Sequence, residues 1–526
     1  MRYVRRFPIA PMLLALYAVL TLLANNIDQI SASQSIRSLV ISLIAAAVLI
    51  GAFMLAFKDW HRAALAAFLV VLLFFSYGHV YGSSKQVQIS SILIGRHRFL
   101  IPLWIGLLAL GMFWVSRRLQ DPAPLSGILN LVAGILILVP LSTILIFLVR
   151  SRSIQFPSEP QSLGNCDLTV PVDSRAPDIY YIILDAYARA DDLLEVYQFD
   201  NSDFLEGLRG MGFYVAEWSQ SNYTSTHFSV TSSLNMDYLQ SLDESIYDGA
   251  PFDVAPLWPL LGDNAARRNL ECIGYKVVAF DSGWHALGWR DADVYISSVS
   301  TSFAEALELS GGINAFESML IHSSAAMVLT DAATIMPKFL EIDTSEPFRD
   351  HRLRMLYLLD SLERVVPAIE GPKFVFAHIL ITHKPYVFGP NGEEIELGGP
   401  FTFADTDTDS IDDQEKTRYR DQITFINMRI ENIIREILEV SETPPVIILQ
   451  SDHGSGMGRR LSILNAYFLP NGGDQLLYDT ISPVNTFRVV FNSYLSGDYV
   501  ILDDISYSSA YESYDFSVVP NEHSTN

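Results

Sequence analysis

The stretch Pro444–Gly456, PPVIILQSDHGSG, decides the fold of the larger part of this chain. Its apolar run, Val446 to Leu449, predicts a strand buried on both faces, as in parallel sheets covered by helices. Asp452 and His453 follow closely, and in such sheets ligands bind beyond the carboxyl ends of the strands. The glycines next to them allow another segment of backbone to pass close by. An ordinary turn would have the same pattern, so partners from other segments are needed to indicate a site.

Three further short apolar runs predict strands of the same sheet, at 178–184, 276–280 and 373–380. Longer amphipathic stretches between them predict helices, at 201–212, 255–270, 349–366 and 413–440. Apolar strands that alternate with helices are typical of a largely parallel sheet with helices on both faces. The sequence therefore predicts an α/β domain.

Polar side chains also follow two of the other strands. Asp185 comes directly after 178–184, and the run 373–380 contains His378 and leads into His383. An isolated Asp is often a turn or cap residue, and a lone His in an apolar run is often a core residue. Because parallel strands end at one edge, these groups converge with Asp452 and His453. Carboxylates and imidazole together favour a divalent metal such as Mg, Mn, Ca or Zn.

The segment 221–235, SNYTSTHFSVTSSLN, crowds hydroxyl groups near a predicted helix start. One interpretation is helix capping by Ser and Thr. The other is a nucleophile, because a metal-bound hydroxyl at a helix start loses its proton more easily. The pattern alone leaves Thr224, Ser225 and Thr226 as rival candidates.

The first 150 residues differ sharply in charge from the rest of the chain. They contain 12 Lys and Arg and three acids, which leaves 23 basic and 56 acidic residues for 151–526. Five uncharged apolar runs, each about long enough to cross a bilayer, lie in this part: 7–25, 38–57, 63–82, 99–116 and 126–149. We expect a bundle of five transmembrane helices over 1–150, a linker over 151–176 and an outer domain over 177–526.

The charges beside these runs predict the orientation in the membrane. Seven basic residues flank one side, namely Arg2, Arg5, Arg6, Lys58, Arg62, Arg117 and Arg118, against four on the other. The richer side is expected to be cytoplasmic, so the outer domain lies outside the cytoplasm of a multi-pass cell-membrane protein. Its acidity argues against nucleic acid as a partner. Cys166 and Cys272 either form a disulfide there or remain unpaired.

The order of the motifs resembles the alkaline phosphatase and sulfatase superfamily. The motifs are ILD (183–185), Thr226-His-Phe-Ser229, a strand ending in His378-x-x-x-x-His383, and SDHG (451–454). With membrane helices ahead, the chain resembles lipoteichoic acid synthases and lipid A phosphoethanolamine transferases. The resemblance implies an alkaline phosphatase-like domain that holds one divalent ion, Mn, Mg or Zn. It also implies that Asp185, Thr226, Asp452 and His453 bind the metal, that Thr226 is the nucleophile, and that His383 contacts the transferred group.

The substrate residues implied by the resemblance are less complete. Arg290, in the segment 274–295, falls near an arginine that the synthases use on phosphate, but their upstream polar residues are replaced by Asp281 and Gly283. Asn222 and His378 are assigned to substrate binding. The segment THFSV lacks the Pro and Arg of the sulfatase signature, and an additional Asp-x-x-x-His ligand set for a second metal is not found.

These observations predict a membrane-anchored, metal-dependent transferase. It would move a phosphoglycerol or phosphoethanolamine head group from a membrane phospholipid to an envelope glycan, lipid or polymer through a phosphothreonine intermediate. One alternative is a hydrolase at the same site, acting as a phosphodiesterase, phosphatase or sulfuric ester hydrolase. Another is a nonenzymatic membrane receptor on a decayed fold, against which the joint presence of Asp185, Thr226, Asp452 and His453 argues.

Overall fold

A computed structural model describes most of the 526-residue chain. The described residues are 7–523 without 28, 90–91, 156–167, 172–174, 248, 250–255, 285–286, 299–311, 332–341, 404–412, 457–458 and 510–512. The chain divides into two compact units. The first contains Met1–Leu148, Ser300–Phe348 and Leu397–Thr402, and the second contains the remaining residues.

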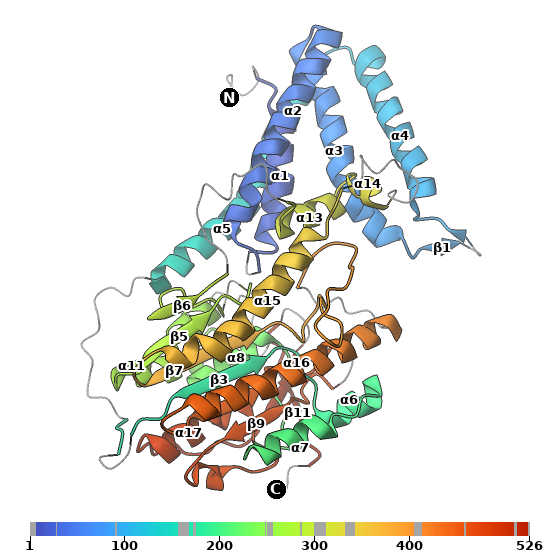
Figure 1. Cartoon of the computed structure of the whole chain (residues 1–526). Helices are drawn as coiled ribbons and strands as arrows, with labels where there is room; N and C mark the ends of the chain where they lie inside the picture. Colours follow the sequence, from blue (N-terminus) through green and yellow to red (C-terminus); the bar gives the residue numbers. More distant parts are fainter. Residues whose placement is uncertain are drawn as a thin grey trace. The chain divides into compact units, whose positions relative to one another are not determined.

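The first unit is built on apolar helices (Figure 1). These are α1 (Ala10–Ala24), α2 (Ile36–Phe57), α3 (Trp60–Ser84), α4 (His97–Phe113) and α5 (Ala123–Gln155). Within the described residues, four spans are long and apolar enough to cross a membrane: Ala32–Phe57, Trp60–Ser84, His97–Arg118 and Ala123–Val149. Many of their apolar side chains are exposed, as expected for helices that face lipid.

The expected fifth span, 7–25, is shorter than predicted. Helix α1 has 15 residues, so it is about 22 Å long against the roughly 30 Å of a hydrocarbon core. Pro11 lies in its first turn, and Asn26 beyond its end donates a side-chain hydrogen bond to the Leu22 carbonyl. Polar and proline residues at the two ends thus limit the helix, and the prediction of five full spans was slightly too high.

Two short helices from much later in the chain complete the first unit. They are α13 (Ala315–His322) and α14 (Met327–Asp331). Phe316 and Met319 are buried in one apolar cluster with Val19, Leu23 and Ile144 of the long helices. Both helices fall within 177–526, the range assigned to the outer domain, whose boundaries remain a prediction.

The second unit contains a seven-stranded sheet in the order β4-β9-β8-β3-β7-β5-β6. The strands are β3 (Ile179–Leu184), β4 (Tyr214–Val215), β5 (Lys276–Phe280), β6 (Val294–Ile296), β7 (Lys373–Ile379), β8 (Val446–Gln450) and β9 (Asn465–Phe468). The pairs within β8-β3-β7-β5-β6 are parallel, and β9 pairs antiparallel with β8 and β4. The predicted α/β fold with a mainly parallel sheet is confirmed.

Helices cover both faces of this sheet (Figure 1). One face packs against a cluster that includes residues of α8 (Thr226–Asn235), α11 (Ala265–Cys272) and α17 (Thr486–Tyr494). Helices α15 (Glu346–Arg364) and α16 (Asp413–Val440) lie over the other face. The remaining helices of this unit include α6 (Ala190–Tyr197), α7 (Ser202–Gly210), α9 (Leu239–Leu242) and α10 (Leu257–Gly262). The helix expected over 255–270 is two helices, because Asn264 begins α11 by accepting the Arg267 amide at 2.9 Å.

The strand register determines which residues meet at the carboxyl edge. Ile183 of β3 lies opposite His378 of β7 on one side and Gln450 of β8 on the other. Asp185 continues the ladder, since its backbone N–H donates to the Ile379 carbonyl at 3.0 Å. The ends of β3, β7 and β8 therefore bring their polar residues together.

We expect Gln450→Leu to lower the stability of the second unit. Tyr181 donates to the Gln450 amide oxygen at 2.8 Å, and the amide nitrogen donates to Asn465 and Thr486 at 2.9 and 3.1 Å. Leucine would leave buried polar partners unsatisfied, at about 1–3 kcal/mol. The thermal unfolding midpoint of the full chain in detergent measures this effect. Gln414→Leu, at an exposed position of α16, is the control, and equal midpoints for both variants would contradict the expectation.

Candidate active site

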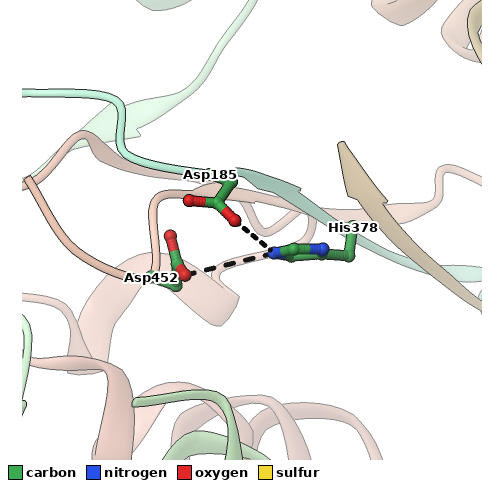
Figure 2. A group of neighbouring side chains, drawn as sticks. All are labelled: Asp185, His378 and Asp452. Carbon is green, nitrogen blue, oxygen red and sulfur yellow. Dashed lines mark ion pairs between the residues drawn. The ribbon is translucent and has the colours of Figure 1, made fainter. Parts of the chain in front are cut away.

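Three ionisable side chains gather where β3, β7 and β8 end (Figure 2). His378 Nε2 lies 3.1 Å from Asp185 Oδ2 and 4.0 Å from Asp452 Oδ2. All three side chains are almost completely buried. Figure 2 shows both carboxylates directed toward the same edge of the His378 ring. The strand ends thus deliver two carboxylates and one imidazole to a common point.

The chemistry of this group fits a divalent metal. Both Asp185 oxygens, Asp452 Oδ2 and both His378 nitrogens have no hydrogen-bond partner among the described residues. Even the 3.1 Å contact lacks the alignment of a hydrogen bond. Leaving buried charged groups unsatisfied is expensive unless a metal or ion partner compensates. One atom from each residue lies within 4.8 Å of the others, so the three can share one cation.

His453 offers a further nitrogen to the same centre. A carbonyl can only accept a hydrogen bond, so His453 Nδ1 donates to the Gly454 carbonyl at 2.8 Å. In the neutral ring, the lone pair is then on Nε2. Nε2 lies 3.6 Å from Asp185 Oδ1 and 3.7 Å from Asp452 Oδ2. It also lies 3.3 Å from Thr226 Oγ1. The four residues assigned to the metal by resemblance are therefore neighbours.

The loop after β8 is held by the backbone. Asp452 Oδ1 accepts the amides of Ala186 and His453 at 3.2 and 3.0 Å, which leaves Oδ2 for the cluster. A Cβ on Gly454 would lie 2.6 Å from the Ser462 carbonyl oxygen, so only glycine fits there. The sequence expectation that glycine permits a close backbone approach is confirmed at this position.

Thr226 is the first residue of α8, so its hydroxyl lies at the positive end of the helix dipole. It is buried, whereas Thr224 and Ser225 are half-buried. Among the described residues, of these three rival hydroxyls only that of Thr226 contacts His453. Ser229 lies one helical turn later and donates to the Tyr223 carbonyl at 2.8 Å, which fixes the loop before the helix.

His383 lies beside the group and affects its charge. Burial by itself would raise the pKa of Asp185, but attraction to His383, then His378 and His453, holds that pKa well below its usual range. His383 Nδ1 donates to the Lys384 carbonyl at 2.7 Å, which orients the ring. Its ring centre is 6.5 Å from that of His453. Asp185 is thus a carboxylate at neutral pH, as a metal ligand must be.

Trp284 forms an aromatic wall that sequence reasoning missed. Its ring centre lies 6.4 Å from that of His378, 6.3 Å from that of His383 and 5.3 Å from that of His227. The indole is 8% exposed, and its Nε1 has no hydrogen-bond partner among the described residues. A buried N–H donor without a protein partner is available to a water molecule or to a polar group that enters the site.

Helix α15 supplies two more charged or titratable residues near the site. Arg354 lies 3.9 Å from Asp281 Oδ2, and its Nη1 would be 2.6 Å from a Cβ at Gly283. His351 is fully buried, and burial, then Arg354 and His383, lower its pKa to about 3. The His351 ring is therefore neutral at neutral pH. Because residue 283 is a glycine, the Arg354 guanidinium can occupy the space that a side chain would fill there.

Two predicted substrate residues make other contacts. Arg290 is exposed at a turn and donates a hydrogen bond to Tyr295. The Asn222 amide accepts from the Val484 N–H at 2.8 Å and donates to Ser482 and the Ile505 carbonyl at 3.0 and 2.9 Å. Asn222 thereby ties together segments of the fold. The substrate roles of Arg290, Asn222 and His378 remain predictions, and His378 lies with Asp185 and Asp452 in the group that could hold a metal ion.

The comparisons with known proteins give likenesses at the level of structure. No family model and no curated protein matches the chain. The integral membrane lipooligosaccharide phosphoethanolamine transferase A (EptA) from Neisseria meningitidis is 11% identical, over 92% of this chain and 95% of its own, with a TM-score of 0.40. The C-terminal periplasmic domain of EcEptC from Escherichia coli, in complex with Zn, is 11% identical, over 63% and 85%, with a TM-score of 0.39.

A third solved structure is the lipoteichoic acid synthase LtaP from Listeria monocytogenes. It is 10% identical, over 64% of this chain and 78% of its own, with a TM-score of 0.34. These proteins belong to the enzyme groups that the motifs resemble. At such identities and TM-scores, the likeness by itself establishes no activity for this chain.

Asp452→Asn is expected to reduce metal affinity by more than roughly 100-fold. Losing a residue that only hydrogen-bonds to a metal ligand already reduces affinity roughly 10–100-fold, and Asp452 is expected to bind the metal directly. Elemental analysis of the purified full chain, titrated with Zn or Mn, measures the bound metal. Asp178→Asn is the matched control, because Asp178 pairs with Lys373 beside the opposite end of β3. Unchanged metal content in Asp452→Asn would contradict the assignment.

Proposed function

We propose that this protein is a membrane-anchored, metal-dependent transferase. It moves a phosphoglycerol or phosphoethanolamine head group from a membrane phospholipid to an envelope glycan, lipid or polymer. The observation that supports it most is the Thr226 hydroxyl, at the start of α8 and 3.3 Å from His453 Nε2, beside buried carboxylates that have no hydrogen-bond partner. A nucleophile next to a metal-binding group is the arrangement needed for covalent phosphoryl transfer.

Asp185, Asp452 and His453 would hold the metal together with the Thr226 oxygen, and His378 lies close enough to join them. A bound divalent ion, Mn, Mg or Zn, would lower the pKa of the Thr226 hydroxyl and offset charge on the phosphoryl oxygens. Thr226, which releases its proton to solvent before the cycle begins and is restored as the alkoxide at its end, would form a bond from Oγ1 to phosphorus as the bond from phosphorus to the lipid alcohol breaks. The product is phosphothreonine.

His383 is the group that we assign to proton transfer. Its Nδ1 proton is engaged by the Lys384 carbonyl, so Nε2 is the ring atom that exchanges a proton with substrate. It gives a proton to the departing lipid alcohol. In the second half-reaction the acceptor hydroxyl attacks phosphorus, the bond to Thr226 breaks, and the acceptor proton passes to His383.

Within the first unit, a later segment of the chain contacts the helical bundle. Arg37 at the start of α2 pairs with Glu317 of α13, and the Ala325 amide donates to Phe74 of α3. A later segment of the chain thus reaches the end of the bundle where α2 begins, opposite the Lys58 and Arg62 end. Since the more basic end is expected in the cytoplasm, this later segment lies outside it.

The transferase can be tested by trapping its intermediate. The full chain, with metal, is incubated with head-group-labelled phosphatidylglycerol or phosphatidylethanolamine, and the intact protein is weighed. We expect an adduct of one phosphorylated head group in the wild type, none in Thr226→Ala, and an undiminished adduct in Thr224→Ala. A released labelled head group without acceptor would indicate the hydrolase alternative. No adduct and no release from any donor, with metal bound, would contradict both.

Trp284→Phe should weaken transfer while leaving the fold unchanged. The ring is kept, but the buried N–H that would donate to a phosphoryl oxygen is lost, so a decrease in kcat/KM of roughly tenfold is expected. The rate of head-group release from the labelled lipid measures it. Trp258→Phe, which removes an N–H from another ring beside His227, is the control. Equal rates for the wild type and Trp284→Phe would show that the N–H takes no part.

A further inference from the structure

Arg354 of α15 is a largely buried cation with an unused hydrogen-bond donor. Its side chain is 17% exposed, and its Nε has no hydrogen-bond partner among the described residues. A guanidinium carries five N–H donors in a planar fork that matches two oxygens of a phosphate or carboxylate. Burying a charged donor without a partner is costly, so this group is available to water or to an anion that enters the site.

Asp281 lies near the Arg354 guanidinium, but its oxygens already accept from other donors. Arg354 Nε is 3.9 Å from Asp281 Oδ2, which is longer than a hydrogen bond. Asp281 Oδ1 accepts the Gly283 amide at 3.1 Å, and Oδ2 accepts the Ser297 hydroxyl at 2.8 Å. The carboxylate thus attracts the guanidinium and orients it, while the N–H donors of Arg354 stay available for a ligand.

Gly283 provides the space that the guanidinium occupies. Arg354 Nη1 would lie 2.6 Å from a Cβ at this position, and the φ angle of Gly283 is +90°. A side chain here would displace the guanidinium and strain the backbone. Asp281 and Gly283 are the two residues that replace the polar residues of the synthases. The departure from the synthase pattern is therefore also what accommodates Arg354.

The segment 281–284 lies at the edge of the sheet where the candidate active site is built. It follows β5, which pairs parallel with β7, so that Ala279 lies opposite Phe376. Because the two strands run in the same direction, the residues after β5 reach the same carboxyl edge as His378 of β7. The loop that receives the Arg354 guanidinium is thus part of the surroundings of the site.

Trp284 offers a second N–H donor on this side of the site. Its Nε1 is buried without a hydrogen-bond partner among the described residues, and its ring centre is 6.3 Å from that of His383. Phe403 stacks on Trp284 with ring centres 6.5 Å apart and contacts His351 at 5.3 Å. His351 is one helical turn before Arg354. Phe403 therefore connects the wall of the site to the turn of α15 that carries the guanidinium.

We propose that Arg354, together with the Trp284 N–H, binds the oxygens of the transferred phosphoryl group. The resemblance assigns this role to Arg290, which is exposed and donates to Tyr295. In this chain the arginine comes from helix α15, because Gly283 leaves room for it. A phosphate ester is the ligand class, since its oxygens match the planar fork and carry the opposite charge. Identifying the anion as the transferred group rests on the proposed function, whereas anion binding itself does not depend on catalysis.

Calorimetric titration of the full chain with inorganic phosphate tests binding without turnover. The parent is Thr226→Ala, loaded with Zn and freed of excess metal, so that phosphothreonine cannot form. We expect Arg354→Gln to weaken phosphate binding roughly 10–100-fold, and more than Arg290→Gln does, because a charge-assisted pair of hydrogen bonds is lost. Arg364→Gln, at the exposed end of α15, is the matched control. Equal affinities of the parent and Arg354→Gln, or a larger loss in Arg290→Gln, would overturn the proposal.

Two further variants distinguish contact with the anion from damage to the fold. Arg354→Lys keeps the charge but not the planar fork, so its affinity should lie between those of the parent and Arg354→Gln. Gly283→Ala should weaken phosphate binding by displacing the guanidinium, and this effect should vanish when residue 354 is glutamine. An equal effect of Gly283→Ala in both backgrounds would show that the loss comes from the backbone and would contradict a role for Arg354.

The labelled-lipid reaction separates this proposal from the proposed function. With Thr226 intact, Arg354→Gln should lower kcat/KM for head-group release roughly 100-fold. An adduct that forms at the wild-type rate in Arg354→Gln would contradict the role of the arginine and uphold the transferase. Phosphate binding that depends on Arg354, in a chain that forms no adduct and releases no head group, would uphold the anion site and contradict the transferase.

Discussion

The parallel pairing of β3 with β7 on one side and β8 on the other is the constraint on which the site depends. This ladder sets Ile183 opposite both His378 and Gln450 and brings Asp185 and Asp452 to the same edge. Each strand is completely buried, so burial of apolar side chains stabilises the register. A slip of one residue would turn each side chain to the opposite face and separate the polar groups. The apolar strands are thus what holds costly buried charges in place.

Much of the fold of the second unit could be predicted because its signals are local. The strand at 276–280 and the helix at 413–440 have the predicted bounds, since a continuous apolar run and a long amphipathic period identify them. The helix expected over 255–270 breaks at Asn264, a single capping residue inside an otherwise regular pattern. The return of residues 312–331 to the membrane helices was not predictable. It depends on pairs such as Arg37 and Glu317, which are 280 residues apart.

The sequence predicted which polar residues gather at the candidate site better than it predicted the walls around them. Asp185, Asp452, His453 and Thr226 lie together because short motifs at strand and helix ends mark them. His378 was expected to contact substrate, and its place beside Asp185 and Asp452 follows from which face of β7 it occupies. A run of apolar residues does not reveal that face. Trp284 and Arg354 come from a loop and a helix whose approach is set by tertiary packing, so periodicity gave no signal for either.

The segments that join the first unit have a practical consequence for how the protein can be divided. A chain cut after residue 150 would keep α13 and α14 but lose the long helices that bury Phe316, Met319 and Met327. Those apolar side chains would then face water, and exposed apolar patches promote self-association. A soluble form of the second unit would therefore need these segments shortened or made polar, in addition to removal of the long apolar helices.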